Sequence, residues 1–161
     1  MKKLIIGVMG GGEGAPPEVC EMAYKLGGLI AKEGWVLLNG GRGVGVMEAS
    51  ARGAKEQGGL TVGILPDRNT ELASPFIDIP ILTGMGDGRN FINILSSDIV
   101  VALPGRSGTI SEIALALKNG KNVILLNFSL ENLFIEYQKA GIMILVNKPE
   151  EVIEEIKKLF L

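Results

Sequence analysis

Short, almost wholly apolar runs alternate with stretches of helical periodicity along the whole chain, and this alternation restricts the fold more than any other feature. Such runs are typical of strands buried on both faces, which occur in parallel sheets covered by helices. Strands are predicted at residues 3–9, 35–39, 60–65, 77–83, 99–103, 122–127 and 142–147. Helices are predicted within residues 16–34, 40–59, 88–97, 107–120, 130–141 and 148–160. The expected fold is α/β: a doubly wound, mostly parallel Rossmann-like sheet of about seven strands with helices on both faces.

The composition is that of one folded unit. Of the 161 residues, 47% are hydrophobic and 21% are charged, which is enough apolar material for a core without disulfides or metals. No apolar run approaches the roughly 18 residues that span a bilayer, and the run at the N-terminus ends too early for a secretory signal. We therefore expect a single Rossmann-like nucleotide-binding domain over residues 1–161, cytoplasmic and without a membrane partner. Pro80 predicts that the strand at 77–83 lies near a sheet edge.

Residues that the chain lacks disfavour several classes of function. It has no histidine, which excludes Ser-His-Asp triads, histidine metal sites and imidazole acid–base catalysis. The one cysteine, Cys20, lies in a predicted amphipathic helix, where a structural role is expected. No metal site is predicted. The net charge of −2 and the pI of about 5.3 argue against a nucleic-acid partner.

Glycine-rich loops follow four of the predicted strands, at residues 9–17, 39–47, 83–91 and 103–112. In doubly wound sheets, ligands bind beyond the carboxyl ends of the strands, at the point where the strand order reverses. Four of the five arginines fall in predicted loops: Arg42, Arg68, Arg89 and Arg106. Because guanidinium groups bind phosphate and carboxylate in a planar, forked geometry, the loops predict a local anion site on an acidic protein.

The first loop matches the dinucleotide fingerprint G-x-G-x-x-A only loosely, through Gly10, Gly12 and Ala15. The acidic ribose anchor expected after the second strand is absent, since that strand ends in Asn39. NAD-dependent hydride transfer is therefore disfavoured. The loop is either a tight strand-to-helix turn or a nucleotide-facing loop without dinucleotide specificity.

The second and third loops each carry one arginine. Arg42 suits a phosphate or a ribose, but no Gly-Lys-Ser/Thr follows it, which disfavours kinase and ATPase chemistry. Glu48, in the following helix, is either solvated or faces the cleft. Arg89 stands at the entry to a helix, where it opposes the helix dipole, a cost that an anionic ligand would offset. Asp87 or Asn90 would cap this helix if they have no other role.

The fourth loop is the strongest candidate for an anion cradle. Gly105, Ser107, Gly108 and Thr109 place backbone amides and two hydroxyls before a helix N-terminus, where the dipole favours phosphate. Glu112 has two interpretations. It is either a capping partner of Ser107 or Thr109, or a carboxylate that faces a ribose and stabilises positive charge at the anomeric carbon.

At this point the sequence resembles a known superfamily. Residues 104–112, PGRSGTISE, resemble the PGGxGTxxE signature of the Lonely Guy phosphoribohydrolases, once widely labelled lysine decarboxylases. Residues 40–54 resemble the GGxxGxMxAxxxGA element of the same superfamily. The segment GRNFINILSSDIVVALPGRSGT is most similar to the branch that contains molybdenum cofactor carrier proteins. The Rossmann-like domain of the DNA-processing protein of natural transformation is a more distant relative.

The resemblance implies a homodimer that binds a nucleoside monophosphate or a phosphorylated pterin, with the phosphate on the PGGxGT turn. In the hydrolases of the superfamily, an arginine and the terminal glutamate of the signature serve N-glycosidic cleavage, and Arg89 and Glu112 match them. Three positions depart from the pattern: Arg106 replaces the second glycine of PGG, Ser111 replaces a glutamate, and Asn90 replaces a lysine. No lysine lies in the four loops to form a Schiff base, so decarboxylation is disfavoured.

Two functions remain open at this stage. The first is a binding or carrier protein for a phosphorylated nucleotide-like ligand, either a nucleoside monophosphate or a molybdopterin-type cofactor, with no cofactor required and Glu112 and Arg89 as ligand contacts. The alternative is a phosphoribohydrolase with Glu112 and Arg89 as catalytic residues. The mean hydropathy of +0.32 and the resemblance favour a homodimer or higher homo-oligomer. The predicted ligand-binding residues are Gly10, Gly11, Gly12, Gly40, Gly41, Arg42, Gly43, Met47, Arg89, Asn90, Pro104, Gly105, Arg106, Ser107, Gly108, Thr109 and Glu112.

Overall fold

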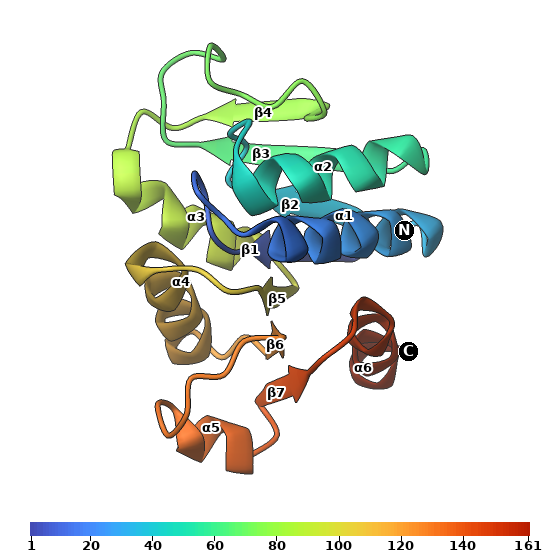
Figure 1. Ribbon diagram of the computed structural model, residues 1–161, viewed down its shortest axis with the longest axis vertical. Coiled ribbons are helices and arrows are strands. Elements are labelled where there is room, and N and C mark those ends of the chain that lie inside the picture. Colours follow the sequence, from blue (N-terminus) through green and yellow to red (C-terminus); the bar gives the residue numbers. More distant parts are fainter.

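The computed structural model describes all residues from 1 to 161 and contains one sheet of seven strands (Figure 1). All pairings are parallel, and the strand order is β4-β3-β2-β1-β5-β6-β7. The strands are β1 (Ile5–Met9), β2 (Val36–Asn39), β3 (Leu60–Leu65), β4 (Ile79–Leu82), β5 (Ile99–Ala102), β6 (Val123–Leu126) and β7 (Met143–Val146). The predicted fold class and strand number are confirmed. The order reverses at β1, whose neighbours are β2 and β5.

Helices cover both faces of the sheet (Figure 1). On one face α1 (Pro17–Lys32), α2 (Gly45–Glu56) and α6 (Pro149–Phe160) bury a core of 21 residues that includes Ile6, Leu37 and Ile124. On the other face the short 3-10 turn η1 (Gly86–Gly88) leads into α3 (Arg89–Ser96), followed by α4 (Ser107–Lys118) and α5 (Ile135–Lys139). No helix is both long and apolar enough to cross a membrane.

Two details differ from the sequence-based expectation. The helix predicted at 130–141 is reduced to α5, because Glu131 and Phe134 adopt positive φ angles of 53° and 63° and so interrupt a regular helix. In α3, the apolar residues Phe91, Ile94 and Leu95 recur at a spacing that predicts one buried face, but Phe91 and Leu95 are 41% and 49% exposed, whereas Ile94 is fully buried. A strip of apolar surface therefore remains open beside this helix.

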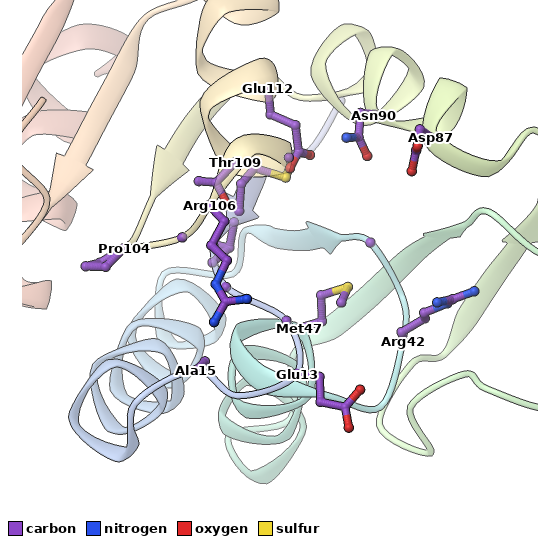
Figure 2. Close-up of a pocket in the computed structure, with 18 of the residues that line it drawn as sticks. Glu13, Ala15, Arg42, Met47, Asp87, Asn90, Pro104, Arg106, Thr109 and Glu112 are labelled. Atoms are coloured by element: carbon purple, nitrogen blue, oxygen red, sulfur yellow. The ribbon is translucent and has the colours of Figure 1, made fainter. Parts of the chain in front are cut away.

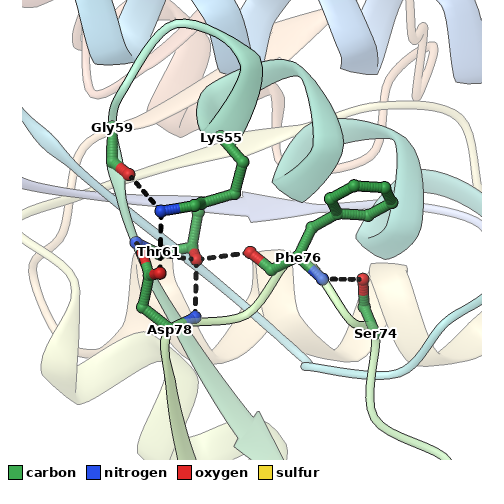
Figure 3. Close-up of polar contacts among 6 residues, drawn as sticks. All are labelled: Lys55, Gly59, Thr61, Ser74, Phe76 and Asp78. Atoms are coloured by element: carbon green, nitrogen blue, oxygen red, sulfur yellow. Dashed lines mark hydrogen bonds and ion pairs between the residues drawn. The ribbon is translucent and has the colours of Figure 1, made fainter.

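The edge strand β4 is anchored by polar contacts at its start (Figure 3). The Asp78 carboxylate accepts a hydrogen bond from the Thr61 amide at 3.0 Å and forms an ion pair with Lys55 at 2.7 Å. The Thr61 hydroxyl donates to the Phe76 carbonyl at 2.6 Å and accepts from the Asp78 amide at 2.9 Å. These contacts fix β4 on β3 although Pro80, placed at an edge as predicted, lacks an amide proton.

Helices α1 and α2 touch backbone to backbone through two glycines. A Cβ atom on Gly27 would lie 2.0 Å from the Ser50 carbonyl oxygen, and one on Gly53 would lie 1.9 Å from the Tyr24 carbonyl oxygen. Real Cβ atoms do not approach backbone so closely, so neither position accepts a side chain without moving a helix. The contact matters for function because the loops that precede these helices carry glycines of the predicted site.

We expect Gly53→Ala to lower the free energy of unfolding by about 2–3 kcal/mol, because overpacking outweighs the better helix propensity of alanine. Gly28→Ala is the matched control, since its Cβ would meet only the Gln57 side chain, at 3.3 Å, and the Gly53 carbonyl oxygen, at 3.5 Å. That variant should stay within about 1 kcal/mol of the wild type. Urea titration measures both, and equal stability of the two variants would contradict this account.

Candidate functional site

A pocket of about 600 Å³ lies at the carboxyl ends of the strands (Figure 2). All four glycine-rich loops contribute to it, so the glycines share one rim as the sequence predicts. The loops after β1 and β5 meet where the strand order reverses, and the Gly11 amide donates to the Pro104 carbonyl at 3.0 Å. The pocket therefore occupies the position where doubly wound sheets bind ligands.

Most of the predicted site residues line this pocket. They are Gly10, Gly11, Gly12, Gly40, Arg42, Met47, Arg89, Asn90, Pro104, Gly105, Arg106, Gly108, Thr109 and Glu112. Gly41, Gly43 and Ser107 are not among the lining residues: the Gly41 amide donates to Asn39 Oδ1 at 2.8 Å, and the Gly43 amide donates to the Leu72 carbonyl at 3.0 Å. These two amides donate hydrogen bonds within the protein and so stabilise the second loop.

Sequence reasoning did not assign a further set of lining residues to ligand binding. They are Val8, Met9, Glu13, Gly14, Ala15, Pro16, Pro66, Gly86 and Asp87. Six of the nine belong to β1 or to the first loop, so their place could have been inferred by extending the rim along that loop. Pro66 follows β3 directly and carries no signal of its own.

The turn at residues 105–109 has five consecutive backbone amides that donate to no group of the protein. No side chain caps α4, which begins at Ser107. A Cβ on Gly105 would lie 2.1 Å from the Thr109 hydroxyl and 3.0 Å from the Gly11 amide nitrogen, so only glycine fits there. The result is a row of free donors at a helix N-terminus that opens into the pocket, an arrangement suited to an anion.

Glu112 is 6% exposed, lines the pocket, and accepts a hydrogen bond from Asn93 Nδ2 at 3.1 Å. The capping interpretation of Glu112 is therefore wrong. Burial raises the pKa of Glu112 to about 7, against the opposing effects of the Asn93 hydrogen bond and the Arg89 charge. Near neutral pH this carboxyl group is thus present in both its neutral and its charged form.

Arg89 enters the pocket from the start of α3. A Cβ on Gly40 would lie 2.7 Å from its Nη1 and 2.8 Å from its Nη2, so the guanidinium rests directly on the Gly40 backbone. Nη1 donates to Asn90 Oδ1 at 3.0 Å, and Nε is buried without a partner. Burial lowers the pKa of Arg89, and the Glu112 charge offsets part of that effect. Neither Asp87 nor Asn90 caps α3 with its side chain.

Arg42 lies at the rim and is already paired. Its Nη2 and Nε donate to the two carboxylate oxygens of Asp67, at 2.7 and 3.1 Å. This forked pair joins the loop after β2 to the loop after β3, and its hydrogen bond lowers the pKa of Asp67. The guanidinium therefore stabilises the rim of the pocket, and its positive charge is already paired with Asp67.

Asn39 supports the second loop, and Glu48 lies outside the pocket. Asn39 Nδ2 donates to the Met47 carbonyl at 2.9 Å and to the Ser50 hydroxyl at 3.1 Å, while its Oδ1 accepts from the Gly41 amide. Glu48 is not a lining residue, and its Oε2 is buried without a hydrogen-bond partner. Of its two sequence interpretations, that of a group facing the cleft does not hold.

Three classes of group can therefore contact a ligand here: free amides, unpaired guanidinium nitrogens and one buried carboxyl group. No cluster of three or more cysteine, histidine, aspartate or glutamate side chains is arranged to hold a metal ion. Cys20 is a free thiol outside the pocket.

The chain is similar to a known family and to proteins of known structure. The model of the SLOG cluster4 family matches residues 3–153. The molybdenum cofactor binding protein of Rippkaea orientalis superposes with a TM-score of 0.94 and 52% identity, covering 100% of this chain and 99% of that one. The molybdenum cofactor carrier protein of Chlamydomonas reinhardtii superposes with a TM-score of 0.91 and 44% identity, covering 98% of both chains.

Hydrolases and a DNA-binding protein are also similar. The cytokinin riboside 5′-monophosphate phosphoribohydrolase of Mycobacterium tuberculosis is 38% identical over 105 residues, which cover 64% of this chain and 56% of the hydrolase. DNA processing protein A of Helicobacter pylori, at 21% identity and a TM-score of 0.71, shares the fold. These matches confirm the resemblance to the Lonely Guy superfamily and to its carrier-protein branch.

The buried carboxyl group predicts a dependence of stability on pH. Because the pKa of Glu112 is raised from 4.5 to about 7, the folded protein binds more protons than the unfolded chain in this range, and its free energy of unfolding falls as the pH rises through it. In Glu112→Gln this loss is absent. The free energy of unfolding of the variant, relative to that of the wild type, should therefore rise by on the order of 2–3 kcal/mol between about pH 5 and pH 8. Urea titration across this range measures the difference. Glu71→Gln, which removes an exposed carboxyl group outside the pocket, is the control, and parallel profiles for all three proteins would contradict the assignment.

Proposed function

The chain belongs to the SLOG cluster4 family, and we propose that it is a binding or carrier protein for a phosphorylated, nucleotide-like ligand of the molybdopterin or nucleoside monophosphate type. One observation carries the proposal: five consecutive amides at residues 105–109 have no acceptor in the protein, and four of these residues, all but Ser107, line a pocket of about 600 Å³. Three of these residues, Arg106, Ser107 and Gly108, are exposed to water, and a phosphate would replace several of the hydrogen bonds to water at once.

The remaining lining residues suit the rest of such a ligand. Arg89 supplies a partly buried positive charge with an unpaired Nε. Met9 and Met47 offer polarizable surface for a flat ring system, and Glu112 can hydrogen-bond to ring or ribose groups in either protonation state. The carrier proteins that superpose on nearly the whole chain support a molybdenum cofactor as the cargo.

A second candidate function is phosphoribohydrolase activity, favoured by the position of Glu112 beside Arg89 in the pocket. In that reaction the bond between the base and C1′ of a nucleoside 5′-monophosphate breaks, water adds its oxygen to C1′, and a proton passes to the base. A carboxylate would stabilise the positive charge that develops at C1′. With a pKa of about 7, however, Glu112 is only partly ionised at neutral pH. Partial ionisation would lower such a rate only about twofold, and a pKa near the working pH also suits acid–base catalysis, so the assay below decides between the two functions.

We also propose that the protein assembles with copies of itself. Strand β4 is a sheet edge with Ile79, Ile81 and Leu82 all 43–44% exposed, and Phe91 and Leu95 of α3 add further open apolar surface. A second copy of the chain would remove this surface from water.

Gly108→Asp tests the phosphate site directly. A Cβ at this position meets no atom within 4 Å, and an aspartate in the first turn of α4 suits the helix dipole, so the variant should fold. Its carboxylate would occupy the anion position, and we expect the affinity for molybdenum cofactor, measured anaerobically by pterin fluorescence, to fall at least about tenfold. Gly108→Ala fills the same space without charge and should bind like the wild type. Equal affinity of the two variants would remove this turn from the site.

Incubation with a panel of nucleoside 5′-monophosphates separates carrier from hydrolase. The carrier function predicts thermal stabilisation by ligand without release of free base, as measured by chromatography. Base release that disappears in Glu112→Gln while the ligand still stabilises the variant would establish the hydrolase instead.

Light scattering in solution tests the assembly, with more than one chain per particle expected. Ile81→Glu should lower the particle mass by placing a charge in the apolar face while the fold is retained. A wild-type protein of about 17 kDa in solution would contradict the assembly, since one chain has a mass of 17.1 kDa.

A further inference from the structure

We infer that the pocket holds a second anion subsite next to the phosphate turn, so that its ligand carries a diphosphate or a second phosphoryl group. The inference rests on the proposed function, because the first subsite is the turn at residues 105–109. It goes further by naming the chemical class of the ligand: a molybdopterin-type or nucleotide ligand whose phosphate is extended to a diphosphate, as in a nucleoside diphosphate or a dinucleotide.

The first observation concerns Arg106. It precedes α4 in an extended conformation with φ of −106° and ψ of −151°, is exposed, and makes neither a side-chain hydrogen bond nor an ion pair. Its side chain runs away from Thr109 and reaches toward Ala15 of the first loop (Figure 2). The guanidinium thus lies over a different part of the pocket from the amides of its own turn.

The second observation concerns the loop that Arg106 approaches. The amides of Gly12, Glu13 and Gly14 donate to no group of the protein, and the loop is closed by the Ala15 amide, which donates to the Gly12 carbonyl at 3.1 Å. All three residues line the pocket. The Glu13 carboxylate points away from Arg106 (Figure 2), so it does not neutralise the guanidinium, which lines the same pocket as this loop.

The two sets of donors are adjacent. The Gly11 amide bonds to the Pro104 carbonyl at 3.0 Å, and a Cβ on Gly105 would lie 3.0 Å from the Gly11 nitrogen. The first loop and the phosphate turn are therefore in direct backbone contact, with Arg106 extending from one toward the other. Two phosphoryl groups joined by one bridging oxygen match two anion subsites that stand side by side.

A single phosphate does not account for both sets. A monoester offers three terminal oxygens, each of which accepts about two hydrogen bonds. The amides of the four lining residues Gly105, Arg106, Gly108 and Thr109 and the Thr109 hydroxyl supply most of the matching donors without the first loop. Arg106, with five further N–H donors and a full positive charge, would then have no acceptor. A second phosphoryl group gives this charge a partner.

The test uses orthophosphate and pyrophosphate as probes, so that it does not depend on the base or pterin. We expect wild-type protein to bind pyrophosphate at least about tenfold more tightly than orthophosphate, as measured by calorimetry at constant ionic strength. Arg106→Ala should weaken pyrophosphate binding about tenfold or more and orthophosphate binding less than about threefold. Arg68→Ala removes the same charge outside this pocket and should change neither affinity.

Amide chemical shifts give a second readout. Pyrophosphate should perturb Gly12 and Gly14 as well as Gly105 and Gly108, whereas orthophosphate should perturb only the latter pair. If the protein binds orthophosphate but pyrophosphate no more tightly, or if Arg106→Ala weakens both alike, the second subsite is refuted and the proposed function stands. If the wild type binds neither probe, both fail.

Discussion

The parallel pairing of β1 with β5 is the contact on which the site depends. The paired residues of these strands are 93 positions apart in the sequence, yet Ile6 to Met9 lie in register with Ile99 to Ala102. Because the strand order reverses at this pair, the loops that follow the two strands are not separated by a crossing connection. Gly11 and Pro104 meet there through a backbone hydrogen bond. The amides of both loops are thereby brought to one space, and the helices that begin after them add their positive ends.

The rest of the fold serves to hold that edge in place. Glycines at 27 and 53 let α1 and α2 pack at backbone distance, so the two loops that precede these helices approach each other. The Arg42–Asp67 pair ties the loop after β2 to the loop after β3. The rim is therefore fixed before any ligand arrives, which reduces the ordering cost of binding.

The sequence predicts the architecture well because its signals are local and repeated. Each apolar run and the helix pattern after it carries its own evidence, and the glycine-rich loops mark the carboxyl ends of the strands. Pro80 alone suffices to place β4 near an edge. The likeness of residues 104–112 to a known signature indicates the candidate phosphate turn. The structure gives the physical reason for glycine at position 105, because Thr109 and Gly11 leave no room there for a Cβ.

What the sequence does not predict is the choice of partner between side chains far apart in the chain. Nothing near Arg42 indicates that Asp67 will pair with it, and nothing near Glu112 points to Asn93, 19 residues earlier. Both choices depend on the packing of strands and helices that local patterns do not encode. For the same reason the sequence does not show that the amides of Gly41 and Gly43 donate hydrogen bonds to Asn39 and Leu72 and are therefore not available to a ligand. The shortening of α5 arises from backbone conformations at Glu131 and Phe134 that composition does not reveal.

The burial of Glu112 beside the turn at residues 105–109 would link binding of an anion to protonation. In the proposed carrier function, a negative charge entering the pocket would disfavour the ionised form of this carboxyl group, so binding of the ligand would be accompanied by proton uptake. By the same linkage, the ligand would be held more tightly at mildly acidic pH than at alkaline pH. Such a carrier could release its ligand in response to pH without any change of conformation.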